Sequence, residues 1–422
     1  MLVSLYYVEL NNTLSPPLAF FRVPLFYGNM FYRRFGRTDL QIPVFSCGGM
    51  RYQQSWQDIS PADVPKANQE NLEACIHRSV DLGINHIETA RGYGSSEMQL
   101  GSILPTFPRE KLIVQTKVSP NEDPREFLAN FDKSLAYLKL DYVDLFSLHG
   151  INNQHLLDLC TVKGGCLEVA EKLRREGRVR HIGFSTHAPS QVIRNAIATD
   201  AFDYVNLHWY FVNDSNWQAV QEAHQRDMGV FIISPNDKGG LLYKPSKKLK
   251  KLCQPLSPMR FNDLYCFRRP EVHTLSLGVS KPSDFDEHIL ALKDYNRIDE
   301  VVPPIEAKLR GAIANSLGQD WVNRWEEGIP CCEDIPGHIN VWEILRLWNY
   351  AKSLDMIEYG KMRYNLLGNA DHWFAGQQAN DLDAVDLSQS FKANPFREKI
   401  PGILREAHAM LVGEPKKRLS QS

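Results

Sequence analysis

The sequence contains no Cys-x-x-Cys pair, and no apolar run long enough to cross a membrane interrupts its start. Its eight cysteines are scattered along 422 residues, which argues against a disulfide framework and against a ribbon-type zinc site. The first 29 residues are apolar in patches, but no run there reaches the ~18 residues of a membrane span. We therefore expect a protein of a reducing compartment, with a cytoplasmic location and no membrane partner.

An excess of charge of one sign is also missing. The formal net charge is -2 and the isoelectric point is near 6.7, so no global field draws the chain to nucleic acid or to an anionic surface. The composition, with 43% hydrophobic and 23% charged residues, is that of a folded protein. Small molecules are the expected partners, no nucleic-acid partner is expected, and the sequence leaves the oligomeric state open.

The strongest regular feature is an alternation of β-branched runs with amphipathic stretches. The eight apolar runs span residues 44–50, 84–90, 111–118, 142–150, 180–186, 203–209, 229–235 and 273–279. Such alternation predicts parallel strands joined by helical crossovers, and eight units close a barrel. No G-x-G-x-x-G opens a helix, which disfavours a doubly wound open sheet. The predicted fold class is α/β, a (β/α)8 TIM barrel with a small C-terminal helical module.

The length of the chain exceeds the roughly 250 residues that such a barrel uses. We expect residues 1–29 to be an N-terminal extension that is either disordered or wrongly assigned to the protein, with Met30 as the biological start. The barrel is expected over 30–295, a helical module over 296–414 and a disordered tail over 415–422. The segment FYRRFGRTDLQIP predicts a hairpin that plugs the barrel floor, and residues 339–354 predict a helix that docks on the barrel.

Four polar residues fall at the expected carboxyl ends of successive strands, where catalytic groups of such barrels lie. Glu88 and Tyr93 follow the second strand, Lys117 ends the third and His149 ends the fourth. A lysine cation beside a phenol favours the phenolate and lowers its pKa from about 10. Tyr93 is therefore the candidate general acid, Glu88 a partner that holds Lys117, and His149 a group that orients a substrate oxygen.

These segments resemble the aldo-keto reductase family, from about Met30 to Leu292. The resemblance lies in YRRFGRTDLQIPVFSCGGM, GINHIETARGYGSSE, LIVQTKV, LDYVDLFSLHG and VRHIGFST. It implies an NADP(H)-dependent enzyme that interconverts a carbonyl and an alcohol by hydride transfer, with Tyr93, Lys117 and His149 at the catalytic positions. The family has aspartate where this chain has Glu88, which keeps the charge but adds a methylene.

The resemblance also implies a cofactor site. It points to Gly49, Met50, Ser185, Asn206, Trp209, Gly239, Gly240, Ser280, Lys281 and Glu287. By the resemblance, the nicotinamide ribose lies near Gly49 and Met50, and the carboxamide lies near Ser185 and Asn206. The nicotinamide ring stacks on Trp209, for which packing in the core is the alternative role. The glycine pair lets the backbone approach the pyrophosphate. Ser280 and Lys281 receive a 2′-phosphate at a helix start, which favours NADP(H) over NAD(H), although NAD(H) stays an alternative.

The C-terminal module resembles a degenerate form of a ferredoxin-like domain found in some bacterial members of that family. Its cluster cysteines are missing, since Cys331 and Cys332 are adjacent and DHWFAGQQA contains none. We therefore predict no iron–sulfur cluster, no metal and a cap that shapes the substrate pocket. Two alternatives remain: a nucleotide-binding regulatory or scaffold barrel with little turnover, and an iron–sulfur electron-transfer reductase, which the missing cysteines disfavour.

Overall fold

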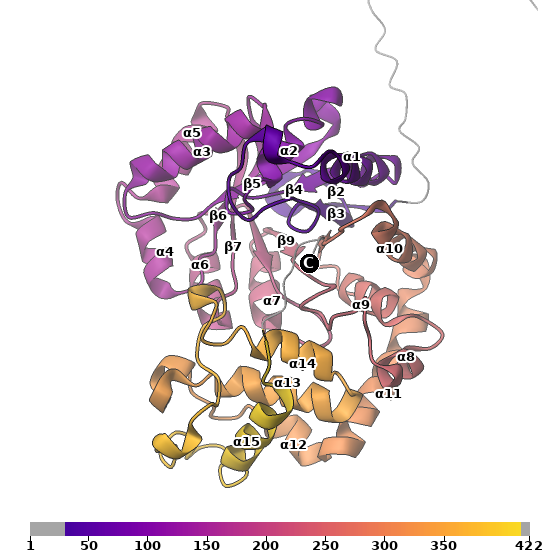
Figure 1. Cartoon of the computed structure of the whole chain (residues 1–422), viewed down its shortest axis with the longest axis vertical. Coiled ribbons are helices and arrows are strands. Elements are labelled where there is room, and N and C mark those ends of the chain that lie inside the picture. The colour runs from indigo at the N-terminus through magenta and orange to yellow at the C-terminus, as the bar shows by residue number, and fades with distance from the viewer. Residues whose placement is uncertain (1–29, 415–422) are drawn as a thin grey trace, which may run out of the picture.

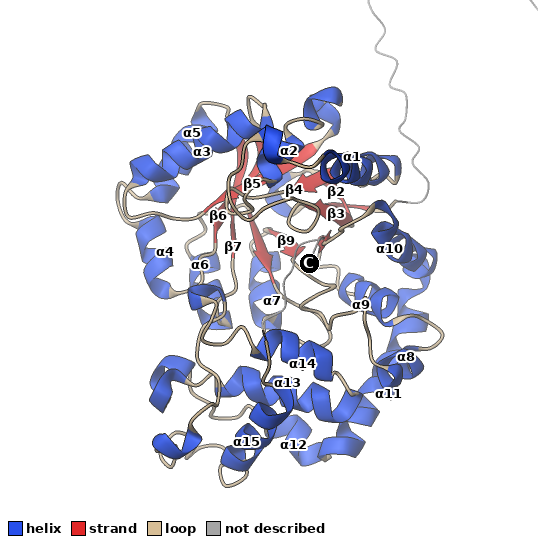
Figure 2. Ribbon diagram, in the orientation of Figure 1, coloured by secondary structure: helices blue, strands red, loops and turns tan. Residues whose placement is uncertain are grey.

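Eight parallel strands form the centre of the structure, a computed structural model that describes residues 30–414 (Figure 1; Figure 2). Hydrogen bonds close them into a barrel in which β3 to β10 follow one another and β10 returns to β3. The strands are β3 Phe45–Gly48, β4 His86–Glu88, β5 Ile113–Val118, β6 Val143–His149, β7 Val179–Ser185, β8 Tyr204–Leu207, β9 Gly229–Ile232 and β10 Thr274–Leu277. Each overlaps one of the eight apolar runs, so the predicted barrel is confirmed. The expected extension 1–29 and tail 415–422 lie outside the described residues.

Helices surround the barrel and shield the outer faces of its strands (Figure 2). They are α1 Lys66–Asp81, α2 Ser96–Leu100, α3 Pro124–Leu138, α4 Gln154–Thr161, α5 Cys166–Arg175, α6 Ser190–Ala198, α7 Trp217–Gln225, α8 Lys247–Cys253, α9 Pro258–Phe267 and α10 Asp286–Ala291. In α3 the side chain of Asp123 caps the first turn, and Phe131 packs its ring 4.7 Å from that of Phe146 in β6. Apolar residues at helical spacing thus cover strands that are buried on both faces.

A two-stranded hairpin closes the amino-terminal end of the barrel. It pairs β1 Tyr32–Arg34 with β2 Gln41–Pro43 around the turn Gly36–Thr38, as the sequence predicted. Phe35 enters an apolar cluster with Ile42, Ile113, Leu145, Tyr204 and Phe231. The backbone N–H of Arg37 donates to the carbonyl of Asp227, just before β9. This floor leaves the opposite end of the barrel as the place for a site.

The C-terminal region is helical and lies beside the barrel (Figure 1). Its helices are α11 Ile298–Leu317, α12 Gln319–Arg324, α13 Val341–Leu354, α14 Ile357–Tyr364 and α15 Ile400–Leu411. The helix expected over 339–354 is found as α13, which packs against α11, α14 and α15. Two consecutive prolines, Pro303 and Pro304, lie within the first turns of α11. Pro303 and Pro304 deprive only the carbonyls of the exposed Asp299 and Glu300 of their helical partners.

The module docks on the loop that follows β8 and on the loop that follows β9. Tyr350 donates a hydrogen bond to the carbonyl of Phe211 at 3.3 Å, and Tyr359 donates to the carbonyl of Lys238 at 2.9 Å. Arg346 donates to the carbonyl of Val212. The segments that end in the barrel mouth are therefore held partly by side chains of the module.

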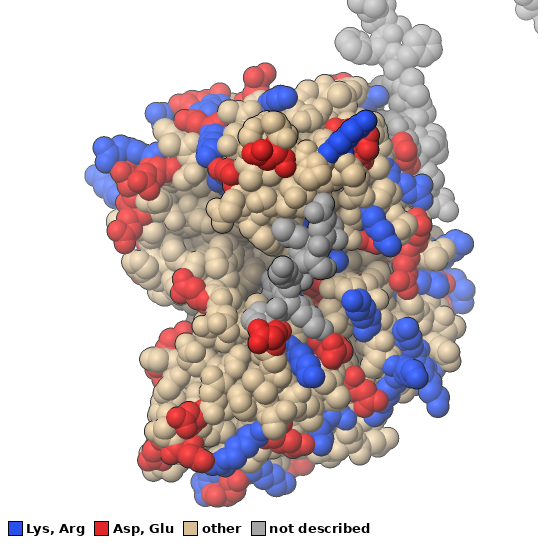
Figure 3. Space-filling view, viewed as in Figure 1, with Lys and Arg blue, Asp and Glu red and all other residues tan. Residues whose placement is uncertain are grey.

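The surface carries charges of both signs, and the cysteines are free thiols. Lysine, arginine and acidic side chains are interspersed over the face seen in Figure 3. All eight cysteines are unpaired, and six of them are buried. Within residues 30–414, no helix combines the length and the apolar character that a membrane crossing needs.

Candidate active site

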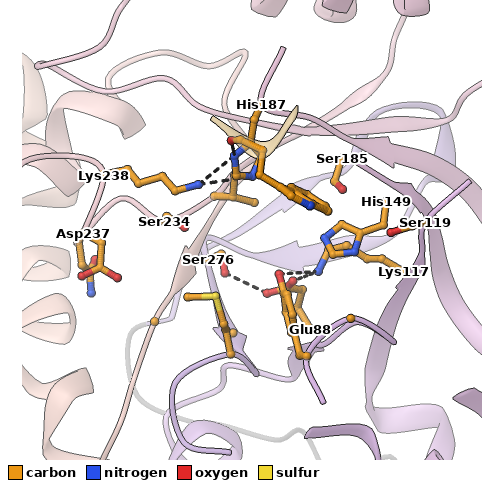
Figure 4. A pocket seen from close by; sticks show the side chains of 18 of the residues that line it. Glu88, Lys117, Ser119, His149, Ser185, His187, Ser234, Asp237, Lys238 and Ser276 are labelled. Atoms are coloured by element: carbon orange, nitrogen blue, oxygen red, sulfur yellow. Dashed lines mark hydrogen bonds and ion pairs between the residues drawn. The ribbon is translucent and has the colours of Figure 1, made fainter. Parts of the chain in front are cut away.

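A cavity of about 470 Å³ opens at the carboxyl ends of the barrel strands (Figure 4). Its walls come from the loops after most of the strands and from one residue of the C-terminal module. The residues lining it are Gly48, Met50, Trp56, Glu88, Gly92, Tyr93, Lys117, Ser119, His149, Ser185, His187, Ile233, Ser234, Asn236, Asp237, Lys238, Ser276, Gly278 and Trp373. All four candidate catalytic residues lie in this set, so the structure brings them together at one end of the barrel.

Lys117 is the centre of the candidate catalytic group. Its Nζ forms an ion pair with Glu88, donates to the carbonyl of Thr89 at 2.8 Å and lies 3.5 Å from the hydroxyl of Tyr93. Glu88 also accepts a hydrogen bond from Ser276 at 3.1 Å, which the sequence had not indicated. The longer side chain at position 88 therefore still reaches the lysine, and a serine from β10 holds its second oxygen.

Burial dominates the protonation of this group. It raises the pKa of Tyr93 above its usual value of about 10 and lowers that of Lys117 well below its own. The sequence-based expectation was a Tyr93 pKa lowered by the neighbouring ammonium. The structure differs because both side chains are withdrawn from water, and the loss of hydration disfavours the phenolate more than Lys117 stabilises it. The phenol thus keeps its proton at neutral pH.

His149 stands next to Tyr93, with the two rings edge to face and their centres 5.7 Å apart. Burial, and then the charge of Lys117, lower the His149 pKa well below its ordinary value, so the imidazole is neutral. Its Nδ1 has no hydrogen-bond partner within residues 30–414. A neutral imidazole with an unused nitrogen beside a phenol suits the orientation of a substrate oxygen.

Several residues of the cavity escaped the sequence reasoning. Trp373, from the module, places its ring 4.9 Å from that of His149. Lys238 lies 3.2 Å from both His187 and His208, measured from its Nζ to one ring nitrogen of each. No local pattern marks these residues, because their loops meet only in the folded chain. The alternation along β8 does give one indication. Residues two apart lie on the same face, so His208 is expected to point into the barrel as Asn206 does.

Part of the expected cofactor set lies at this cavity. Met50 and Ser185 line it, and the N–H of Gly49 donates to the carbonyl of Glu88 at 2.7 Å. Asn206 is fully buried in β8, and neither atom of its amide has a hydrogen-bond partner among the described residues. A buried amide without partners is costly in a folded protein, so its donor and acceptor fit a ligand carboxamide.

Trp209 does not reach the cavity. Its ring stacks on that of Tyr265 in α9, 5.2 Å between centres, and lies 5.0 Å from that of Trp217 in α7. The alternation of β8 explains this, since a residue one position after His208 points outward. The expected stacking on nicotinamide is therefore not met by this side chain, which serves the packing of the barrel on its helices.

The glycine pair after β9 lies behind the cavity wall. A Cβ at Gly239 would collide with the carbonyl of Pro235, and Gly240 has a φ of +133°. Both positions therefore require glycine for the fold of this loop. Asn236, Asp237 and Lys238, rather than the glycines, line the cavity.

The helix start expected to bind a 2′-phosphate is already occupied by a carboxylate. The side chain of Asp284 accepts hydrogen bonds from the N–H and hydroxyl of Ser280, at 2.8 and 2.9 Å, and from the N–H of Lys281 at 3.3 Å. The N–H groups that were to hold a phosphate thus cap their own turn. Lys281 is exposed and Glu287 is partly exposed on α10.

The model of the aldo/keto reductase family matches residues 45–298, which is more than half of the chain. The chain belongs to this family. The match covers the barrel, from β3 to the start of α11, and with it the group around Lys117. It does not extend over the C-terminal module, so the resemblance of that module to a ferredoxin-like domain stays a prediction.

Curated relatives within the family reduce or oxidise sugars and aldehydes, by their names. L-glyceraldehyde 3-phosphate reductase of Escherichia coli K12 is 27% identical over 184 residues, 39% of this chain and 48% of that protein. The chain thus spans about half the length of that relative. L-galactose dehydrogenase of Arabidopsis thaliana is 25% identical over 310 residues, 66% of this chain and 93% of that protein.

Solved structures support the fold. An aldo-keto reductase from Bacillus halodurans in its holo form covers 65% of this chain and 97% of its own, with 19% identity and a TM-score of 0.54. An aldo/keto reductase from Klebsiella pneumoniae in complex with NADP and acetate covers 65% of this chain and 96% of its own, with 18% identity and a TM-score of 0.51. At these identities the likeness is one of architecture.

Proposed function

We propose that this protein uses NADP(H) to interconvert an aldehyde or ketone and an alcohol, with Tyr93 as the general acid. The observation that carries the proposal is the position of the Lys117 ammonium, paired with Glu88 and 3.5 Å from the Tyr93 hydroxyl, at the wall of a cavity of about 470 Å³. Membership of a family of NAD(P)H-dependent oxidoreductases supports it.

In this reaction the dihydronicotinamide supplies a hydride to the carbonyl carbon. The chain supplies the rest. Tyr93 donates its hydroxyl proton to the carbonyl oxygen as negative charge develops there, and the buried Lys117 stabilises the phenolate that remains. His149 orients the carbonyl oxygen from the side of Tyr93. In the reverse direction the phenolate accepts the proton of the alcohol.

At the nicotinamide end the cofactor would be held by Met50, Ser185 and the amide of Asn206, which has no partner within residues 30–414. The adenosine end would be held by fewer groups. Because Asp284 takes the N–H groups at Ser280 and Lys281, the reason for preferring NADP(H) there weakens, and a 2′-phosphate would depend on the side chain of Lys281. The preference for NADP(H) over NAD(H) is therefore kept as part of the proposal and tested with both cofactors.

The test is a panel of aldehydes with NADPH or NADH, followed at 340 nm, for the natural chain and for Tyr93→Phe. We expect the variant to lose about 100- to 10,000-fold in kcat, because it lacks the proton donor. Tyr32→Phe is the matched control, since Tyr32 loses the same hydroxyl at the opposite end of the barrel. Single-turnover oxidation of bound NADPH distinguishes the regulatory alternative: a natural chain that binds NADPH without oxidising it with any aldehyde would contradict the proposal.

Three further predictions accompany this function. The division into a barrel over 30–295 and a module over 296–414, the cytoplasmic location and the lack of an iron–sulfur cluster all stay predictions. Visible spectra of anaerobically purified protein test the last, since a broad band near 400 nm with bound iron would contradict it.

A further inference from the structure

A loop of the C-terminal module reaches the mouth of the barrel. It spans residues 369–375, and the N–H of Gly368 joins its two ends by donating to the carbonyl of Gly376 at 2.9 Å. The loop carries Trp373, which lines the same cavity as Tyr93. It lies beyond the part of the chain that matches the aldo/keto reductase family, so this wall of the cavity is a contribution of the module.

Two loops of the barrel hold the module's loop in place. Asn152, after β6, donates from its amide to Nδ1 of His372 at 3.0 Å, and its amide oxygen accepts the N–H of His187 at 2.7 Å. His187, after β7, donates from its Nδ1 to the carbonyl of Trp373 at 3.0 Å. Both loops begin at the carboxyl ends of barrel strands. The backbone of Trp373 is therefore fixed relative to the catalytic end of the barrel.

The indole ring of Trp373 occupies space that a glycine leaves beside His149. Gly150 follows His149 directly with a φ of +81°, and a Cβ at this position would lie 2.5 Å from Cη2 of the indole. A side chain there would collide with the ring. The indole instead lies edge to face against His149, with 4.9 Å between ring centres, and against His187 at 5.4 Å. Backbone and ring contacts thus agree in placing Trp373 beside the candidate group for orienting a substrate oxygen.

A second tryptophan lines the cavity from the barrel. Trp56, in the loop after β3, is 41% exposed and belongs to the same lining as Trp373. Binding pockets combine such flat apolar surfaces with a few polar groups that fix the orientation of the ligand. Here Tyr93 and His149 provide the polar groups, and the two indoles provide apolar surface near them.

We propose that Trp373 binds the substituent of the carbonyl substrate, and that this substituent is an aromatic ring. The inference rests on the proposed function, since it names the substrate class of the same cavity. While Tyr93 and His149 hold the carbonyl oxygen, the substrate ring packs on the indole in an offset-stacked or edge-to-face contact. This contact adds to the burial of apolar surface, so it favours an aromatic aldehyde over a short aliphatic one.

The first test compares the KM values of benzaldehyde and acetaldehyde for the natural chain, Trp373→Ala, Trp373→Phe and Trp325→Ala. We expect Trp373→Ala to raise the KM of benzaldehyde about 5- to 50-fold and to leave that of acetaldehyde within about twofold, because only benzaldehyde reaches the indole. Trp373→Phe should retain most of the affinity. Trp325→Ala is the matched control, since it removes a partly exposed indole that packs on Trp342 in the module and does not line the cavity.

Two results of this comparison would overturn the inference. An unchanged KM of benzaldehyde in Trp373→Ala would show that the indole does not bind the substrate. An equal loss for both aldehydes would make Trp373 a support for His149 instead. Should Trp373→Ala fail to fold by circular dichroism, Trp373→Leu replaces it, since leucine keeps apolar bulk but offers no aromatic face.

The second test measures binding without turnover. Benzaldehyde is titrated calorimetrically into protein saturated with NADP+, which has no hydride to transfer, and we expect Trp373→Ala to weaken its binding about 5- to 50-fold. If the natural chain reduces no aldehyde, the proposed reductase function fails, and this titration still decides the role of Trp373. Benzaldehyde that does not bind to the natural chain, or that binds equally well to Trp373→Ala, would contradict the inference.

Discussion

Two ion pairs that are buried to a similar degree have different roles in this molecule. At the barrel mouth the side chains of Lys117 and Glu88 are 1% and 4% exposed, and in the module those of Arg346 and Glu343 are 4% and 6% exposed. The first pair lines a cavity and lies beside a phenol. In the second pair Arg346 donates its remaining hydrogen bonds to the carbonyl of Val212 and to the hydroxyl of Tyr359.

The two pairs also differ in how burial affects the pKa of their members. Burial lowers the pKa of Lys117 well below its usual value. Burial also acts on Glu343, but the attraction of Arg346 and Arg363 outweighs it and holds the Glu343 pKa below the ordinary range. A buried charge that its partners do not fully compensate marks the reactive site, whereas a compensated one marks a docking contact.

The largest expected effect is on kcat, which a change in the first pair should lower and a change in the second should not. Lys117→Met removes the cation that stabilises the Tyr93 phenolate, and we expect kcat to fall about 100- to 10,000-fold. We expect only part of the usual cost of breaking a buried pair, since Glu88 keeps the hydrogen bond of Ser276 and the variant no longer buries the Lys117 charge, which burial disfavours. Steady-state kinetics and urea unfolding of the same preparation measure both quantities. A variant that keeps its kcat would contradict the role given to Lys117.

The matching change in the module should cost stability instead. Arg346→Met leaves Glu343 with Arg363 alone and deprives the carbonyl of Val212 of its donor, so we expect a loss of about 3 to 5 kcal/mol of unfolding free energy. The kcat of the folded fraction should stay within a few-fold of the natural chain. A large fall in kcat without a loss of stability would mean that this pair acts on the site.

The same contrast explains how far the sequence leads. Tyr93, Lys117 and His149 could be predicted because each sits at or just beyond the carboxyl end of a strand whose apolar run is unmistakable, and a barrel brings such ends together. The hairpin floor followed from its turn residues in the same way. These are features that local pattern and closure of the barrel decide.

Residues placed by docking could not be found. The carbonyl of Lys238 accepts a hydrogen bond from Tyr359 of α14, and Trp373 of the module packs against His149, contacts between distant segments that no periodicity encodes. The resemblance places Trp209 at the cofactor, whereas the alternation along the chain from Asn206 turns its side chain outward, onto Tyr265. The helix start at Ser280 predicts an open anion site, whereas in the folded chain the carboxylate of Asp284, four residues further on, caps that turn.

The smallest effect of a single side chain concerns acid, which acts on the barrel mouth at a higher pH than on the module. Burial lowers the pKa values of His149, His187 and His208 well below 6.5, so as pH falls below 6.5 the unfolded chain binds protons that the folded chain does not, and stability falls by about 1.4 kcal/mol per pH unit for each histidine. The depressed pKa of Glu343 acts in the same direction but only below about pH 4.3, where the unfolded carboxylate begins to take up protons.

Acid should therefore weaken the barrel mouth before it weakens the module. Urea unfolding at pH 7.0, 6.0 and 5.0 should show a decline that His208→Gln reduces and Glu343→Gln leaves unchanged. His155, an exposed histidine of α4, provides the matched control, because its replacement by glutamine removes a histidine that the fold does not bury. An equal decline of stability in the His208 and His155 variants would show that the buried imidazoles are not the groups through which acid destabilises the barrel mouth.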